Sequence, residues 1–139
     1  MKYKLTDVKI NFMGKTLFQI EAVKCFGDIV KGQKGGFIEK KSNLSQGGDA
    51  WVSGNAKVYG DAKVSGNADY LVIGPIGSRN DITTFFKTAN NDIKVSCGCF
   101  TGNIEEFLEK VNETHGNNNY AKEYKTAVEI AKIHIFGGE

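Results

Sequence analysis

Apolar and polar residues repeat every six positions in the middle of the chain. Four strict hexads begin at Gly48, Gly54, Gly60 and Gly66, and each reads Gly-(Asp/Asn)-Ala-x-(Val/Tyr)-x. A looser version of the same frame covers residues 36–47. A fixed period indicates a repeat architecture, and hexads are typical of a left-handed β-helix in which three of them complete one coil. We therefore predict a hexad-repeat β region at residues 36–71, which amounts to about two coils or a short β-sheet.

The frame also predicts which side chains point inward. Glycine followed by Asp or Asn suits a corner, because these residues adopt positive φ at low cost. The Ala position, which Ile38, Leu44 and Ala68 share, alternates with the Val position, which ends at Tyr70. Both positions should face the core of a short strand.

The segments on either side of the hexads also carry strand patterns. Residues 1–35 alternate as a β-hairpin or meander does, with a turn at residues 13–15, and the glycine-rich run at residues 31–36 is predicted to be turns and a solvated loop. Residues 72–100 should hold further strands, including 82–86 and 93–97, after a buried strand at 70–74.

Residues 101–139 change to helical periodicity and should form two helices and a tail. Asn103 and Glu106 fit a capping box at the start of the first helix, and Gly116 should end it. The second helix is predicted over about 120–132, with Tyr120 and Tyr124 on its apolar side and a closing strand after it. Strands followed by helices predict an α+β fold in a single domain over residues 1–139.

Composition excludes several classes of protein. A formal net charge of +2 is too small to argue for binding of a nucleic-acid polymer or an anionic membrane. No apolar run approaches the roughly 20 residues of a membrane span, and the first residues lack a signal-peptide pattern. Three cysteines, Cys25, Cys97 and Cys99, make neither a disulfide framework nor a standard metal spacing. We therefore expect a cytoplasmic protein with reduced cysteines, no metal and no cofactor.

The sequence contains no catalytic constellation, so we expect a binding protein and not an enzyme. Ser78 lacks the nucleophile-elbow pattern, and His115 and His134 belong to different elements. Arg79 is the only arginine, in a loop that carries two glycines and a proline, and a guanidinium binds phosphate with two parallel hydrogen bonds. The alternative is a surface arginine in a plain turn.

The junction of the two helices is the second candidate for ligand binding. Asn117 and Asn118 offer amide donors and acceptors for ribose hydroxyls or base edges, although helix capping would fully account for one asparagine of the run. Phe107 and Tyr124 are core residues by their helical spacing, although an aromatic side chain at such a junction can also stack on a base.

Several motifs in the C-terminal half resemble a known family. These are Gly74-Pro-Ile-Gly-Ser-Arg79, Cys97-Gly-Cys-Phe100 and Thr114-His-Gly-Asn117. Over roughly residues 48–135 the chain looks like the phage anti-Thoeris sponge family, Thoeris anti-defence protein one. The resemblance implies a binder that sequesters cyclic ADP-ribose signals in the cytoplasm of the infected bacterium without cleaving them.

The resemblance also implies roles for particular residues. Phe107 and Asn117 match the family's pocket aromatic and asparagine, the ring stacking on adenine and the amide bonding the ligand. A family arginine would fall at His134, which departs from the pattern and leaves the ligand isomer open. The resemblance further implies dimers that build a hexamer and, in some members, separate sites for cyclic oligonucleotides.

Two other functions remain open at this point. A short coil leaves apolar ends and sheet edges that the hairpin, the helices and a subunit interface could cover, which suits a homo-oligomer or a structural assembly module. Hexads also occur in hexapeptide-repeat acyltransferases. Those enzymes normally need more coils and a histidine beside a coil, and residues 1–114 contain no histidine.

Overall fold

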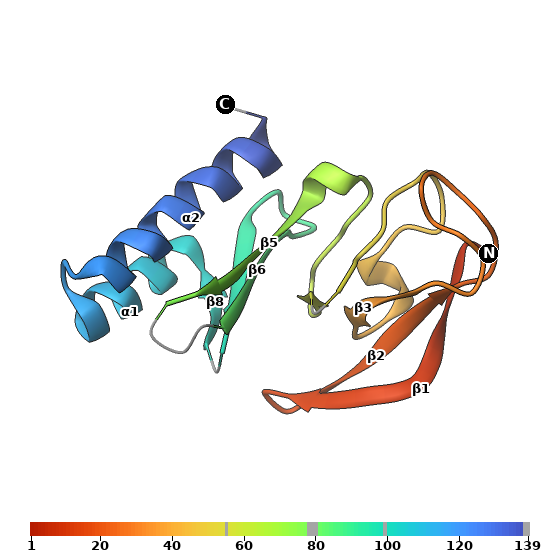
Figure 1. Cartoon of the computed structure of the whole chain (residues 1–139), viewed down its shortest axis with the longest axis horizontal. Coiled ribbons are helices and arrows are strands. Elements are labelled where there is room, and N and C mark those ends of the chain that lie inside the picture. Colours follow the sequence, from red (N-terminus) through yellow and green to blue (C-terminus); the bar gives the residue numbers. More distant parts are fainter. Residues whose placement is uncertain (55, 78–80, 99, 138–139) are drawn as a thin grey trace. The chain divides into compact units, whose positions relative to one another are not determined.

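The computed structural model describes residues 1–54, 56–77, 81–98 and 100–137. The chain consists of two compact units, Met1–Asp69 and Tyr70–Glu139, which we call the N-terminal unit and the C-terminal unit (Figure 1). The N-terminal unit is built of strands and loops, and the C-terminal unit combines a sheet with two helices. The predicted α+β class is therefore confirmed, and the boundary between the units falls within the fourth strict hexad.

The N-terminal unit contains one four-stranded sheet. Its strands, in spatial order, are β1 (Tyr3–Phe12), β2 (Lys15–Ala22), β3 (Lys34–Ile38) and β4 (Lys57–Val58). The first three are antiparallel, whereas β3 and β4 are parallel. Met13 and Gly14, both at positive φ, form the turn between β1 and β2, so the predicted hairpin is confirmed. Two short 3-10 helices, η1 (Lys41–Asn43) and η2 (Asn67–Asp69), lie outside the sheet.

Two glycines that we expected in a solvated loop are instead buried in β3. A Cβ on Gly35 would lie 2.5 Å from the carbonyl oxygen of Val52, and one on Gly36 would lie 2.8 Å from the Val52 side chain. The amide of Gly36 donates to that same Val52 carbonyl at 2.7 Å. The loop prediction is wrong here because the glycines serve close approach of two backbones and not a turn.

Three of the four strict hexads behave as the pattern predicts. Gly48, Gly54 and Gly60 have φ of 64°, 62° and 64° and form equivalent corners. The Ala and Val positions of these hexads are all buried: Ala50, Val52, Ala56, Val58, Ala62 and Val64. The fourth hexad departs from the pattern, because Gly66 is not among the positive-φ glycines and Ala68 is exposed.

The coil is two residues longer than three hexads. Ile38 pairs in parallel with Val58, and Leu44 forms a parallel bridge to Val64. In both pairs, a residue at the Ala position of a loose hexad is opposite a residue at the Val position of a strict hexad. The loose hexads carry the large apolar residues Ile38 and Leu44 at the Ala position and the polar residues Lys40 and Gln46 at the Val position. Stacking large apolar residues on valines therefore sets the register and overrides the simple hexad count.

The start of β1 is bound to the hexad region by buried polar side chains. The Lys2 ammonium donates to the carbonyl of Ala50, and burial lowers the pKa of this amine. The Tyr3 hydroxyl donates to the carbonyls of Leu44 at 2.6 Å and Lys41 at 3.0 Å, and burial raises the pKa of Tyr3 to about 12. Within this unit the N-terminal hairpin thus covers part of the short coil, as expected.

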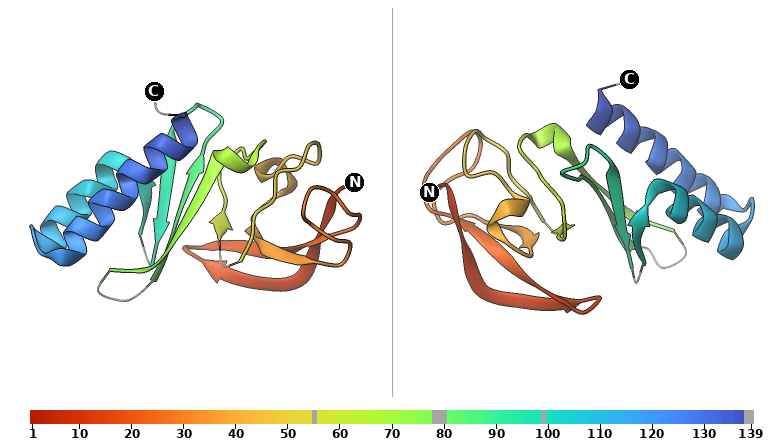
Figure 2. Two further views of the ribbon diagram at one scale, coloured as in Figure 1. Left: turned by 45° about the horizontal axis from the view of Figure 1, so that its top comes forward. Right: turned by 180° about the vertical axis from the view of Figure 1, so that it is seen from behind.

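The C-terminal unit is an antiparallel sheet with two helices on one face (Figures 1 and 2). Its strands, in spatial order, are β5 (Tyr70–Ile76), β6 (Asp81–Lys87), β7 (Ile93–Cys97) and β8 (Phe100–Asn103). The predicted strands are confirmed, although β5 is only half-buried and continues through Pro75. We did not predict β8, because we assigned its residues to the start of the first helix.

The helices are α1 (Ile104–His115) and α2 (Asn119–Phe136). The predicted capping box is confirmed: the Asn103 side chain accepts from the amide of Glu106 at 2.8 Å, and the Glu106 carboxylate accepts from the amide of Asn103 at 2.9 Å. Gly116 ends α1 at positive φ. These contacts explain why the boundaries of α1 were readable from the sequence.

The second helix differs from its prediction at both ends. Tyr120, expected on the apolar side, is 42% exposed, and Ala121 is buried in its place. The expected closing strand is the last turn of α2, in which Ile135 is buried against the core. Over so short a run, the apolar residues Ile133, Ile135 and Phe136 fit a strand pattern as well as a helix pattern. In the structure they continue α2.

Candidate functional site

Four aromatic rings form a continuous chain at the junction of α1 and α2. The ring of Phe107 lies edge-on to that of Tyr124, with 5.5 Å between the ring centres. Tyr124 in turn stacks on the imidazole of His115, with 6.0 Å between the centres and 26° between the planes. His115 lies 5.5 Å from Tyr120. The structure therefore brings the predicted site residues Phe107 and Tyr124 together and adds two further rings.

Exposure increases along this chain of rings. Phe107 is 3% exposed and Tyr124 is 7% exposed, so both belong to the core of the unit, as their spacing predicted. His115 is half-buried, and Tyr120 is 42% exposed. The stacking role that the resemblance implies for Phe107 stays a prediction, since the ring is a core residue in this conformation.

The asparagines of the junction have different positions. Asn118 caps α2, and its side-chain oxygen accepts from the amide of Ala121 at 3.0 Å, which is the alternative reading that we considered for one of them. Asn117 is exposed and lies two residues after His115. The turn that carries it is held by the amide of Asn118, which donates to the His115 carbonyl at 3.2 Å. Of these two predicted residues, only Asn117 is left outside the capping interaction.

The end of β5 is bound to the first turns of α2. The amide of Gly77 donates to the Glu123 carboxylate at 2.9 Å, and a Cβ at this glycine would collide with the Tyr124 hydroxyl. Gly77 is buried and has a φ of 80°. Glu123 was not predicted, because an acidic residue just before Tyr124 is its only signal in the sequence. The predicted Arg79 follows two residues later and lies outside the described residues.

His134 is not brought to the junction within one chain. It is exposed near the end of α2, ten residues after Tyr124. Ten residues of α-helix correspond to a rise of about 15 Å. Within one chain, His134 is therefore separated from Tyr124 by nearly three turns of α2.

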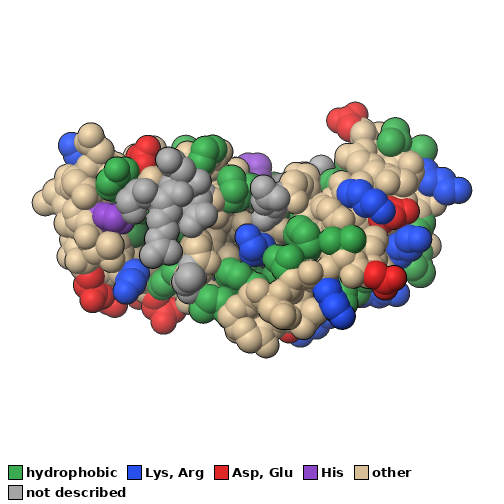
Figure 3. All heavy atoms as spheres, turned by 60° about the horizontal axis from the view of Figure 1, so that its bottom comes forward, with side chains coloured by type: hydrophobic (Ala, Val, Ile, Leu, Met, Phe, Trp, Pro, Cys, Tyr) green, Lys and Arg blue, Asp and Glu red, His purple; other side chains and the backbone are tan. Residues whose placement is uncertain are grey.

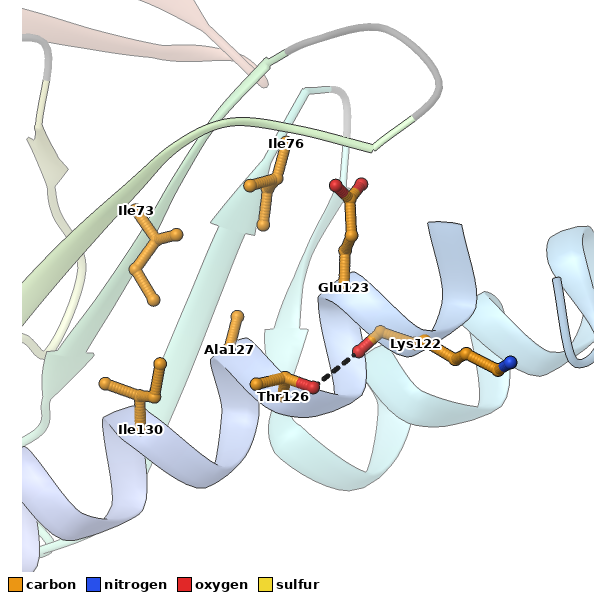
Figure 4. A pocket seen from close by; sticks show the side chains of 7 residues that line it. All are labelled: Ile73, Ile76, Lys122, Glu123, Thr126, Ala127 and Ile130. Carbon is orange, nitrogen blue, oxygen red and sulfur yellow. Dashed lines mark hydrogen bonds between the residues drawn. The ribbon is translucent and has the colours of Figure 1, made fainter. Parts of the chain in front are cut away.

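A shallow groove of about 380 Å³ lies between β5 and α2. Figure 4 shows its floor, in which Ile73 and Ile76 face Ala127 and Ile130. The ammonium of Lys122 extends away from this floor (Figure 4). Ligand sites are usually apolar with a few convergent polar groups, but a floor of this kind offers nothing to a pyrophosphate. The groove is therefore a poorer candidate for a nucleotide than the helix junction.

Within the described ranges, no cluster of three His, Cys, Asp or Glu residues could hold a metal ion. Cys25 is exposed and Cys97 is half-buried, both free, while Cys99 lies outside the described residues. Of the helices that the structure describes, none has the length and apolar character needed to cross a membrane.

Positive and negative side chains are interspersed on the face that Figure 3 shows. In the N-terminal sheet, the Glu21 carboxylate pairs with Lys34 and lies 3.9 Å from the Lys4 ammonium. The Lys34 hydrogen bond lowers the pKa of Glu21. Glu39 likewise lies 3.9 Å from the Lys15 ammonium. These pairs agree with the small net charge.

Comparison with known proteins adds no family to this picture. No protein-family model matches the chain, and no curated protein sequence matches it either. The function must therefore be argued from the residues, from the resemblance of the C-terminal motifs and from the junction geometry.

Proposed function

We propose that the chain is a non-enzymatic sponge that sequesters a cyclic ADP-ribose signal and so blocks Thoeris anti-phage defence in the infected bacterial cytoplasm. The observation that carries the proposal is made at the helix junction, where Tyr124 stacks on His115 and the exposed Asn117 follows His115 by two residues. Rings that stack on a base and amides that bond a ribose or base edge are what such a binder needs. The motifs around Arg79 and Asn117 support the same class of ligand by resemblance.

The proposal is tested by calorimetry of the full-length protein against cyclic ADP-ribose isomers and cyclic di- and trinucleotides. We expect one isomer to bind, and heating should then release it with its mass unchanged. Asn117→Ala should weaken binding, whereas Asn112→Ala, an exposed asparagine on α1, is the matched control and should not. Recovery of a cleaved product would sink the proposal, because it would mean catalysis.

We also propose a homo-oligomer, with dimers that build a hexamer as the resemblance implies. Exposed Ile130 and Ile133 on α2, at 46% and 63%, support association through an apolar surface. Sedimentation of the purified chain should give a single species larger than a monomer. A monomer at micromolar concentration would contradict this part of the proposal.

The competing function is a structural assembly module. The three regular corners of the hexad region and its buried backbone contacts favour this reading, because they describe a scaffold. It predicts an oligomer with no heat of binding for any nucleotide in the same calorimetric series. An acyltransferase is the weakest alternative, and release of thiol from an acyl-coenzyme A by the pure protein would revive it.

A further inference from the structure

The exposure of the rings at the helix junction indicates which of them stacks on the ligand's base. This inference rests on the proposed function. Phe107 is surrounded by three rings: Phe85 at 6.3 Å, Phe100 at 5.5 Å and Tyr124 at 5.5 Å between centres. Aromatic partners occupy such separations when they are in contact. A ring with these neighbours and 3% exposure has no face left for a base.

The exposed end of the same chain of rings meets the requirement. Tyr120 is 42% exposed, and its ring lies 5.5 Å from the half-buried imidazole of His115. His115 also stacks on Tyr124, with 6.0 Å between the ring centres. Because Tyr124 is fixed in the core, the imidazole is held in place before any ligand arrives, which reduces the entropy lost on binding.

A hydrogen-bonding group lies next to these rings. Asn117 is exposed in the turn between the helices, three residues before Tyr120. The turn is fixed by the amide of Gly116, which donates to the Asn112 carbonyl at 3.0 Å, and by the Asn118 cap. This hydrogen-bonded turn therefore carries an exposed amide two residues after His115 and three residues before Tyr120.

We propose that the base of the bound nucleotide stacks on the exposed ring of Tyr120, against which His115 packs at an angle of 57°, and that the Asn117 amide bonds the edge of the base. Phe107 and Tyr124 then act as positioning residues, which hold the imidazole from within the core. This inference rests on the proposed function but assigns the base-stacking role to rings other than Phe107, to which the resemblance assigns it.

The experiment measures affinity by calorimetry for the cyclic ADP-ribose isomer that the unaltered protein binds. Tyr120→Ala should weaken binding roughly tenfold to hundredfold, the range for loss of one base–aromatic contact. Tyr120→Phe keeps the ring and should bind within about threefold of the unaltered protein. Glu129→Ala, which shortens another exposed side chain of α2, is the matched control.

Phe107→Leu separates the two assignments, because it removes the ring while keeping an apolar side chain in the core. We expect a lower melting temperature and nearly unchanged affinity, measured at a temperature where the variant is folded. A large loss of affinity in this variant, with Tyr120→Ala binding normally, would overturn the inference and leave the sponge proposal standing. Absence of any binding by the unaltered protein would overturn both.

Discussion

The two units of this chain are held together in different ways. Both cores contain alanine and valine, but in the N-terminal unit these residues fill the inward hexad positions, where backbones approach closely and long-range bonds from side chains to backbone carbonyls tie the segments together. The C-terminal unit has large rings at its centre, including Phe85, Phe107 and Tyr124. Small core residues let backbones approach closely, whereas rings hold helices and sheet apart and fill the space between them.

This difference determines where each unit should be sensitive. In the N-terminal unit an added methyl group is harmful where backbones meet, as at Gly35 and Gly36. In the C-terminal unit a lost ring is harmful, because no neighbour can fill its volume. The units also carry separate probes: Trp51, the only tryptophan, is buried in the first, and both helices belong to the second.

Phe107→Ala should have the largest effect. Removing a buried phenylalanine costs about 3–5 kcal/mol of unfolding free energy through lost contacts and an unfilled cavity. Urea unfolding followed by helical circular dichroism should show this loss, while the transition seen by Trp51 fluorescence should move much less. Leu108→Ala, at the neighbouring half-buried position, is the control and should cost less. Equal shifts in both probes would show that the two units unfold as one.

Gly36→Ala is the reciprocal change. The new Cβ would lie 2.8 Å from Val52 Cγ1 and 2.9 Å from the Ala56 carbonyl oxygen, so two backbones must separate. Overpacking of this kind costs about 1–3 kcal/mol. The Trp51 fluorescence transition should shift and the helical signal should move little. Gly66→Ala is the matched control, since nothing lies within 4 Å of its Cβ; an equal loss there would refute close packing as the cause.

The sequence predicted the parts of the fold that depend on local periodicity and capping. The inward hexad positions, the Asn103 capping box and the apolar side of α1 all follow from spacing alone. The length of the coil does not follow from spacing, because it depends on which residues of successive layers stack on each other. Ile38 and Val58, which are far apart in the sequence, form one such pair. Gly35 is a second example, because only glycine fits beside the Val52 backbone. In the sequence this glycine cannot be distinguished from a glycine in a loop.

The candidate site was predictable only as a region. Helical spacing brought Phe107 and Tyr124 together correctly, and the asparagine run marked the junction. Exposure was misjudged at Tyr120, because a residue in the first turn of a helix is covered only if the preceding chain folds back over it. The bond from Gly77 to Glu123 joins residues far apart in sequence, and no local pattern announces it.

The smallest effect that we expect concerns the polar contacts of the N-terminal unit. Tyr3→Phe removes the bonds from the hydroxyl to the Leu44 and Lys41 carbonyls, at a cost of about 1–2 kcal/mol near pH 7. The folded pKa of Tyr3, raised to about 12, lies above the unfolded value near 10. The protonated hydroxyl therefore stabilises the fold fully below pH 10, and that contribution is lost as the pH rises toward 12.

Urea unfolding followed by Trp51 fluorescence between pH 7 and pH 12 tests this dependence. The difference in unfolding free energy between the unaltered protein and Tyr3→Phe should be constant from pH 7 to pH 9 and should shrink above pH 10. Lys2, whose pKa is lowered, has the opposite dependence, gaining stability as the pH approaches its unfolded value, but it is present in both proteins and cancels in the difference. A difference that stayed constant up to pH 12 would contradict the raised pKa of Tyr3 and the burial of its hydroxyl that causes it, and would leave the Lys2 bond to the Ala50 carbonyl as the polar contact to test next.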